Sequence, residues 1–101
     1  MVERLMYNIK MFFVYIIKNS IGKLYVGVSK NPDERVLYHN KKQGAKFTKY
    51  KSDFSVVFSE KYQTLKEALE REIQIKKWRR EKKEFLINKY KLGLETKINI
   101  Q

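Results

Sequence analysis

The sequence predicts an α/β domain of the α+β type, in which a small three-stranded, mainly antiparallel sheet is flanked by helices. Two observations predict the sheet: the apolar runs of residues 11–17 and 23–29 follow one another closely, and a third run lies at residues 54–61. A third observation predicts the helices, because helix-start signals follow the second and third runs. The 101 residues are enough for one domain with one modest core.

Composition limits the class of protein. We assign residues 11–91 to the domain, residues 1–10 to an N-terminal extension and residues 92–101 to a C-terminal tail. The chain has no cysteine and one histidine, which excludes a disulfide framework and zinc sites built from thiolates or several imidazoles. No apolar run approaches the roughly 20 residues of a membrane helix, and the first residues lack the order of a secretory signal. We therefore expect a cytoplasmic protein with no membrane partner.

Positive charge is the strongest compositional signal. The chain carries 23 Lys and Arg against 11 Asp and Glu, a formal net charge of +12, and both halves share the excess. Such a surface attracts and steers polyanions, so nucleic acid is the first partner to consider. The alternatives are a surface that is charged for solubility and a basic, ribosome-associated protein.

The first two apolar runs form a hairpin. Residues 11–17 are continuously apolar, which is typical of a central strand covered on both faces. Residues 23–29 form the second strand, and the short turn between the two predicts antiparallel pairing. Tyr15 and Tyr25 lie on one face only if paired residue numbers sum to an even value. We predict this register, with Tyr15 opposite Tyr25 and a three-residue loop at residues 19–21.

A helix begins after the hairpin. Asn31 is a capping residue, Pro32 suits the first helical position, and two acidic residues follow. The helix is expected to run to about residue 40. Arg35 and His39 are four residues apart on it and therefore lie on one face.

The next segment, residues 41–51, reads as a basic loop interleaved with aromatic residues. This mixture suits a loop that follows a nucleic-acid backbone and stacks rings on bases, with an ordinary solvated loop as the alternative. The third strand follows at residues 54–61. A capping box of Thr64 and Glu67 then opens a helix that is expected to reach about residue 80, with a further helical stretch at residues 82–90.

One carboxylate lies within the apolar stripe predicted for the second helix. Solvation of Glu72 there is costly unless a cation meets it. The cation could be a lysine or arginine in a structural ion pair, or a hard divalent ion such as magnesium. The stripe comprises Leu65, Ala68, Leu69, Glu72, Ile75 and Lys76.

Tyr15 and Tyr25 are weak signals when taken singly, because strand tyrosines are more often core residues than catalysts. A phenol with a pKa of about 10 is also a poor base unless a nearby cation lowers that pKa. A lone histidine such as His39 is likewise more often structural. The combination of these residues with Arg35, Glu72 and a basic surface indicates a site.

In order and spacing, these residues resemble the GIY-YIG nuclease family, especially its small single-domain members and the N-terminal nuclease domain of the bacterial excinuclease. Residues 13–15 stand where the family has Gly-Ile-Tyr, and residues 25–27 stand where it has Tyr-Ile-Gly. Residues 30–35 match the segment that leads to the family arginine, and Glu72 matches the metal-binding glutamate. The resemblance runs over residues 11–89.

The sequence departs from the family pattern at three positions. Phe13 replaces the first glycine of the first motif, and His39 stands where excinuclease-type domains have a tyrosine and other members, including small ones, have a histidine. Val28 stands where some members carry a lysine, for which Lys30 is the candidate substitute.

The resemblance implies one-metal hydrolysis of a phosphodiester. Glu72 would hold one Mg²⁺ or Mn²⁺ ion, and Arg35 would stabilise the pentavalent phosphate. Tyr15, held by Tyr25, is the preferred base for the attacking water, with His39 near enough to accept the proton. Gly27 and Asn31 would be structural. The candidate DNA contacts are Lys30, Lys41, Lys42, Lys46, Lys49, Lys76, Lys77, Arg79 and Arg80.

We therefore expect a metal-dependent DNA endonuclease, structure-selective or weakly sequence-selective, that acts in DNA repair or processing or is recruited by a protein partner. The first alternative is a nucleic-acid-binding module on the same fold that has lost catalysis. The second is a basic RNA-associated protein whose tyrosines belong to the core.

Overall fold

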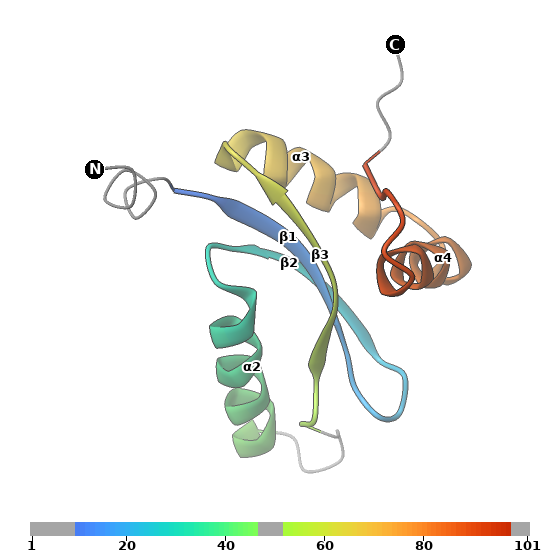
Figure 1. Ribbon diagram of the computed structural model, residues 1–101. Coiled ribbons are helices and arrows are strands. Elements are labelled where there is room, and N and C mark those ends of the chain that lie inside the picture. The colour runs from blue at the N-terminus through green and yellow to red at the C-terminus, as the bar shows by residue number, and fades with distance from the viewer. Residues whose placement is uncertain (1–9, 47–51, 98–101) are drawn as a thin grey trace.

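A three-stranded antiparallel sheet in the order β2-β1-β3 forms the centre of the molecule (Figure 1). The computed structural model describes residues 10–46 and 52–97, with side chains over 10–42 and 52–97. The predicted α+β architecture is confirmed. In chain order the elements are β1 (Phe12–Lys18), β2 (Leu24–Ser29), α2 (Pro32–Lys46), β3 (Ser55–Tyr62), α3 (Leu65–Lys76) and α4 (Arg80–Lys91).

The central strand β1 supplies side chains to two separate cores. Val14 and Ile16 are fully buried and pack with residues of α3, α4 and β3. Tyr15 and Ile17 point to the opposite face and pack against α2. This alternation follows from the period of two in a strand, and it explains why the predicted central strand is apolar throughout. Helix α2 therefore covers one face of the sheet, and α3 and α4 cover the other (Figure 1).

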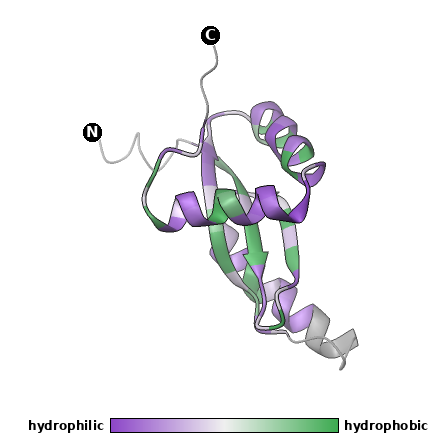
Figure 2. Cartoon of the chain, turned by 90° about the vertical axis from the view of Figure 1, so that its right-hand side faces the viewer, coloured by the Kyte–Doolittle hydropathy of each residue, from purple (hydrophilic) through white to green (hydrophobic). Residues whose placement is uncertain are grey.

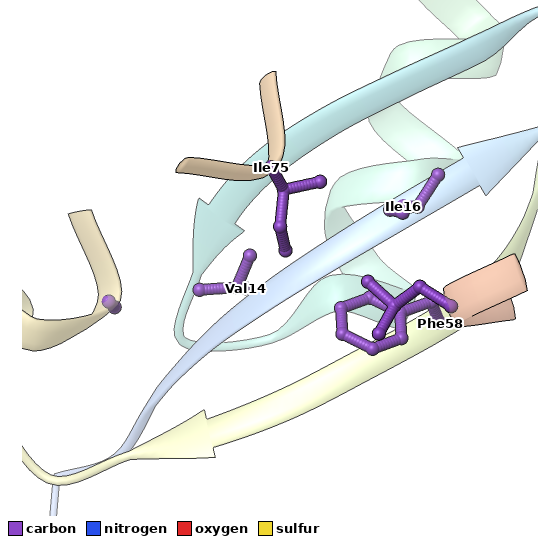
Figure 3. Packing of buried hydrophobic residues seen from close by; sticks show 6 residues of the cluster. Val14, Ile16, Phe58 and Ile75 are labelled. Carbon is purple, nitrogen blue, oxygen red and sulfur yellow. The ribbon is translucent and has the colours of Figure 1, made fainter. Parts of the chain in front are cut away.

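The core beneath α3 and α4 is built from aliphatic side chains and one phenylalanine. Figure 3 shows Val14 and Ile16 of β1 beside Phe58 of β3 and Ile75 of α3. All four are fully buried. The strands are mainly apolar and the helices alternate between apolar and polar residues, as amphipathic helices on a sheet do (Figure 2). No helix in the described ranges is long and apolar enough to cross a membrane.

The hairpin register confirms the predicted parity and corrects the predicted pairing. Tyr15 pairs with Gly27 and Ile17 pairs with Tyr25, so the two tyrosines share the α2 face of the sheet. The expected pairing of Tyr15 with Tyr25 is wrong, because the loop between the strands is longer than three residues. Lys18 pairs with Leu24, which leaves five residues in the connection.

Two hydrogen bonds between Asn19 and Lys23 close this longer loop. The Lys23 N–H donates to Asn19 Oδ1 over 2.7 Å, and the Asn19 N–H donates to the Lys23 carbonyl over 3.1 Å. Gly22 adopts φ 86°, a left-handed conformation that glycine accepts without steric cost. A side chain that bonds to the backbone of its own turn cannot be anticipated from strand periodicity.

Three predicted helix boundaries are wrong. Helix α2 continues to Lys46, so the first half of the predicted basic loop is helical, because its residues other than Gly44 are good helix formers. The second half of that loop lies outside the described residues. Helix α3 ends at Lys76, and α4 begins at Arg80 rather than at residue 82. The chain breaks between them at Trp78, whose ring packs against the buried cluster of α3 and α4.

A buried ion pair attaches the C-terminal segment to the sheet. The Glu60 side chain is 2% exposed and accepts two hydrogen bonds from Arg71, over 2.9 and 3.1 Å. Arg71 also donates to the Thr96 carbonyl over 3.0 Å, and Tyr62 donates its hydroxyl to Glu60 over 2.8 Å. Burial alone would raise the pKa of Glu60, but hydrogen bonds from Arg71, Thr96 and Tyr62 outweigh it and lower that pKa. Thr96 therefore attaches the segment after α4 to the Glu60–Arg71 pair.

Candidate active site

The phenol of Tyr15 lies at the centre of the α2 face of the sheet. The residue is 7% exposed, and its ring lies directly over Gly27 of the paired strand. A Cβ atom added to Gly27 would lie 2.6 Å from the Tyr15 hydroxyl oxygen and 2.7 Å from Cζ, which is too close for any real contact. The absence of a side chain at Gly27 therefore makes the space that holds this phenol.

Three charged side chains change the pKa of the Tyr15 phenol. Burial raises the pKa of its phenol, and the Arg35 guanidinium, as a charge and as a hydrogen-bond donor, opposes this rise without cancelling it. Glu72 raises the pKa further and Lys76 lowers it. The phenol is therefore protonated at neutral pH, where it can donate a hydrogen bond or orient water. A raised pKa weighs against Tyr15 as the base.

His39 and Tyr25 form an aromatic cluster with Phe54. The His39 ring centroid lies 4.8 Å from that of Tyr25 and 4.7 Å from that of Phe54, both in edge-on contact. Burial lowers the pKa of His39, and the positive charges of Arg35, Lys23 and Lys42 lower it further. The imidazole is therefore neutral at pH 7 and able to accept a proton.

One nitrogen of His39 has no protein partner. The Nε2 atom is buried and makes no hydrogen bond within the part of the chain that the structure describes. Buried polar atoms are nearly always satisfied, and an exception calls for a water or a ligand. Nε2 is thus a buried nitrogen that the described residues leave without a hydrogen-bond partner.

The Asn40 side chain holds Phe54, and with it the histidine. Its amide nitrogen donates to the Phe54 carbonyl over 2.9 Å, and its carbonyl oxygen accepts from the Phe54 N–H over 2.8 Å. This reciprocal pair links the middle of α2 to the residue that precedes β3. Sequence reasoning missed both Asn40 and Phe54, because neither position carries a periodic or motif signal.

Glu72 lies at the border of the buried side of α3. Its side chain is 16% exposed and pairs with Lys76 over 3.2 Å, so an ion pair of the kind expected from the sequence exists, with an exposed lysine of the same helix. The predicted stripe is rotated: Ala68 and Ile75 are buried, whereas Leu65 and Leu69 are 46% and 40% exposed. The buried side of α3 runs instead through Ala68, Arg71 and Ile75. Arg71 can lie on this side because it forms an ion pair with the buried Glu60.

The chemistry of Glu72 fits a divalent ion held by a single protein carboxylate. No group of three or more His, Cys, Asp or Glu that could hold a metal occurs within residues 10–42 and 52–97. Magnesium needs no such group, since one or two carboxylates with waters and substrate phosphates complete its shell. Glu72, close enough to influence the Tyr15 phenol, is the residue of the site that could hold such an ion.

The five predicted site residues are related to one another by one ring contact and by the effects of charge on pKa. Arg35 acts on Tyr15 and on His39, Glu72 acts on Tyr15, and the Tyr25 ring contacts the His39 ring. The cluster thus contains a fixed cation, a carboxylate, a neutral imidazole and two phenols. This set can bind a phosphate, orient water and accept a proton.

A hollow of about 360 Å³ opens beside Arg35 at the start of α2. Asn31 caps the helix as predicted: its Oδ1 accepts the Glu34 N–H over 3.2 Å. Sequence reasoning missed Tyr38, whose ring lies 5.5 Å from the Arg35 guanidinium carbon; the spacing of three residues on one helix was the available signal. The lining residues are Ser29, Lys30, Asn31, Glu34, Arg35 and Tyr38.

The predicted DNA-contacting residues occupy two sides of the molecule. Lys41 and Lys42 are exposed on α2, whereas Lys77 and Arg79 are exposed at the connection between α3 and α4. Arg80 pairs with Glu84 over 2.7 Å, and Lys76 pairs with Glu72, so both charges are partly compensated. The Lys46 side chain and the whole of Lys49 lie outside the described residues. Lys30 lines the hollow.

Comparisons with known proteins give a consistent result. The sequence matches the family described as "GIY-YIG catalytic domain" over residues 11–91. The UPF0213 proteins of Staphylococcus aureus strains Mu3 and N315 are each 49% identical over 75 residues, covering 74% of this chain and 92% of theirs. The solution NMR structure of a UPF0213 protein from Bacillus halodurans is 31% identical with a TM-score of 0.50, covering 77% of this chain and 83% of that one.

Proposed function

Because the chain belongs to the GIY-YIG catalytic domain family, which supports a nuclease-type function, we propose that it is a metal-dependent endonuclease that hydrolyses phosphodiester bonds in DNA. One observation carries the proposal. The Arg35 guanidinium acts on both the buried Tyr15 phenol and the neutral His39, beside the carboxylate of Glu72. A phosphate bound at Arg35 would therefore meet a water-orienting group, a proton acceptor and a metal ligand.

Arg35 binds the phosphate and stabilises its transition state. A guanidinium keeps its charge and presents donors that match two phosphate oxygens. Fixed charge aimed at the pentavalent phosphate needs little reorganisation as the reaction proceeds. The second interaction of Arg35, with the Tyr15 phenol, holds the guanidinium at the site.

Tyr15 and His39 handle the attacking water. The protonated phenol orients the water, and the neutral imidazole of His39 accepts its proton. The water oxygen forms a bond to phosphorus as the bond from phosphorus to the leaving oxygen breaks, and the leaving oxygen takes up a proton. Tyr25 positions the imidazole through its edge-on ring contact.

Glu72 would hold the divalent cation, Mg²⁺ or Mn²⁺. When bound, such an ion neutralises charge on the phosphate and on the leaving oxygen. The residue itself contributes a half-buried carboxylate whose protein partner, Lys76, is an exposed and therefore displaceable lysine. Lys76 can then turn towards the DNA backbone.

The surrounding cations position DNA without reading its sequence, since phosphate contacts carry no base information. We propose structure-selective or weakly sequence-selective cutting in DNA repair or processing, with a protein partner as a further source of specificity. The exposed Lys41 and Lys42 on α2 lie on the same side of the sheet as the site.

The test is a divalent-metal titration with nicked, flap and linear DNA. Cleavage should require Mg²⁺ or Mn²⁺, and Arg35→Ala and Glu72→Gln should each lower the rate on the order of 10²-fold or more. Glu70→Gln is the matched control, because Glu70 is exposed on the same helix and faces away from the site. Full activity of folded Glu72→Gln protein would overturn the metal assignment. Salt-dependent binding without cleavage would identify a catalytically inactive module, and a preference for structured RNA would identify an RNA-associated protein.

A further inference from the structure

We propose that the hollow beside Arg35 binds one unpaired nucleotide next to the phosphate that is cut, with Tyr38 as the stacking platform for its base. This inference rests on the proposed function and names its substrate class. It follows from the size of the hollow, the charges around it, the exposed ring of Tyr38, and the link through Arg35 to the candidate active site.

The hollow has the size of a small-ligand site. Its volume of about 360 Å³ lies at the lower end of the range of roughly 300–1,000 Å³ for pockets that hold small molecules. Its walls come from two elements, the end of β2 with the following turn, and the first two turns of α2. Of the six lining residues, Ser29, Lys30, Asn31 and Arg35 carry side-chain donors that suit a sugar-phosphate, and Tyr38 adds an aromatic ring.

The charges of the hollow favour an anion. Lys30 and Arg35 contribute two cations, against the single carboxylate of Glu34. Within the described residues neither cation forms an ion pair; the paired cations are Lys18, Arg71, Lys76 and Arg80. Lys30 and Arg35 are therefore available to a phosphate on either side of a bound nucleotide.

Tyr38 presents an aromatic face to this charged space. The residue is 56% exposed, although burial of its aromatic ring would be favourable. Its only charged ring contact in the described structure is with Arg35, whose guanidinium carbon lies 5.5 Å from the ring centroid. Aromatic rings beside cations are the groups that bind single-stranded nucleic acid, because bases of every kind stack on them.

Arg35 joins the hollow to the candidate active site. The same guanidinium contacts Tyr38 on one side and acts on the Tyr15 phenol on the other. A phosphate held by Arg35 at the site would therefore place the neighbouring nucleotide at Tyr38. A base can stack on Tyr38 only when it is unpaired, so the preferred substrates are flaps, single strands and frayed ends rather than intact duplex.

Binding of a short probe tests the site without any cleavage. The full chain, ¹⁵N-labelled and free of divalent ions, is titrated by NMR with 5′-phosphorylated dithymidylate and with the same molecule lacking its second base. We expect the amide signals of Ser29, Lys30 and Tyr38 to shift, and the removal of the base or Tyr38→Ala to weaken binding about tenfold. Tyr38→Phe should bind as wild type, because the ring is retained.

Leu37→Ala is the matched control, since Leu37 is 70% exposed on the same helix and lies outside the hollow. It should bind as wild type, and circular dichroism should show all variants folded. Shifts confined to other surfaces, no shifts at all, or equal affinity with and without Tyr38 or the base would each overturn the inference.

A cleavage assay separates this inference from the proposed function. Flap DNA with a normal or an abasic nucleotide beside the cut should differ in KM by about tenfold for wild type and not for Tyr38→Ala, with kcat changed little. If no DNA is cut by wild type under any divalent ion, the proposed function fails, and the NMR titration still decides whether the hollow binds a nucleotide.

Discussion

The absence of a side chain at Gly27 determines where the Tyr15 phenol can lie. Gly27→Ala would place a Cβ atom 2.6 Å from the hydroxyl oxygen of a ring that is 7% exposed. We expect the phenol to be displaced, with a loss of about 1–3 kcal/mol of stability from overpacking and a large fall in cleavage rate. Urea denaturation and steady-state cleavage measure the two effects.

A double-mutant cycle shows whether this clash is the cause. Tyr15→Phe removes the atom closest to the added Cβ, although Cζ remains at 2.7 Å. The stability cost of Gly27→Ala should therefore be smaller in the Tyr15→Phe background than in wild type. Equal costs in both backgrounds would mean that the two residues are independent.

The low pKa of His39 has a consequence for the pH dependence of the rate. Burial and the charges of Arg35, Lys23 and Lys42 lower it from 6.5, so the imidazole stays neutral as the pH falls through that value. If His39 accepts the proton, the acid limb of kcat should lie below pH 6.5, and His39→Gln should remove it. A pH–rate profile at saturating metal checks this; a limb above 6.5 would contradict the assignment.

At the scale of elements, the Glu60–Arg71 pair couples β3, α3 and the C-terminal segment. Removing one partner of a buried pair leaves an uncompensated charge, so we expect Arg71→Met to destabilise the fold by about 3–5 kcal/mol at neutral pH. Arg79→Met, an exposed change, should cost little. Urea denaturation of both variants measures the difference.

The same pair predicts the direction of acid denaturation. The folded pKa of Glu60 is below its ordinary value of 4.5, so its contribution to stability is complete above that value and is lost as the pH falls through the folded pKa. In Arg71→Met the carboxylate is buried without its partner and favours protonation. The stability gap between wild type and variant should therefore narrow as the pH falls, starting above pH 4.5, where the variant takes up its proton, and ending below 4.5, where wild type does. A constant gap would show that Arg71 acts through packing alone.

Local signals in the sequence predicted the features that depend on neighbouring residues along the chain. The α2 start followed from Asn31 and Pro32, and the shared face of Tyr15 and Tyr25 followed from strand parity. The pairing partner of Tyr15 could not be predicted, because the Asn19 side chain closes a longer loop than composition suggests.

Tertiary contacts decided the rest of the fold and site. The exact position of the break between α3 and α4 depends on where Trp78 packs, and the placement of His39 depends on the Asn40–Phe54 hydrogen bonds. Neither follows from periodicity or propensity, which describe neighbours along the chain. Tyr38 was within reach of sequence reasoning, since it lies three residues after Arg35 on the same helix.

At the scale of the whole molecule, the net charge of +12 should govern affinity. The logarithm of the DNA association constant should fall linearly with the logarithm of salt concentration, because each bound phosphate releases counterions. Lys42→Gln or Lys77→Gln should each reduce the slope by about one if that residue contacts a phosphate. Fluorescence anisotropy over a salt series gives the slopes, and an unchanged slope for Lys77→Gln would remove the connection between α3 and α4 from the DNA interface.

Each face of β1 supports a core, and the α2 face also carries the Tyr15 phenol of the candidate site. Val14 and Ile16 serve the core beneath α3 and α4, while Tyr15 and Ile17 serve the face that carries the site. Substitutions on one face can therefore accumulate while the other stays intact. A lineage could lose the chemistry at Tyr15 and keep a stable domain, or remodel the α2 side towards a new substrate without rebuilding the fold.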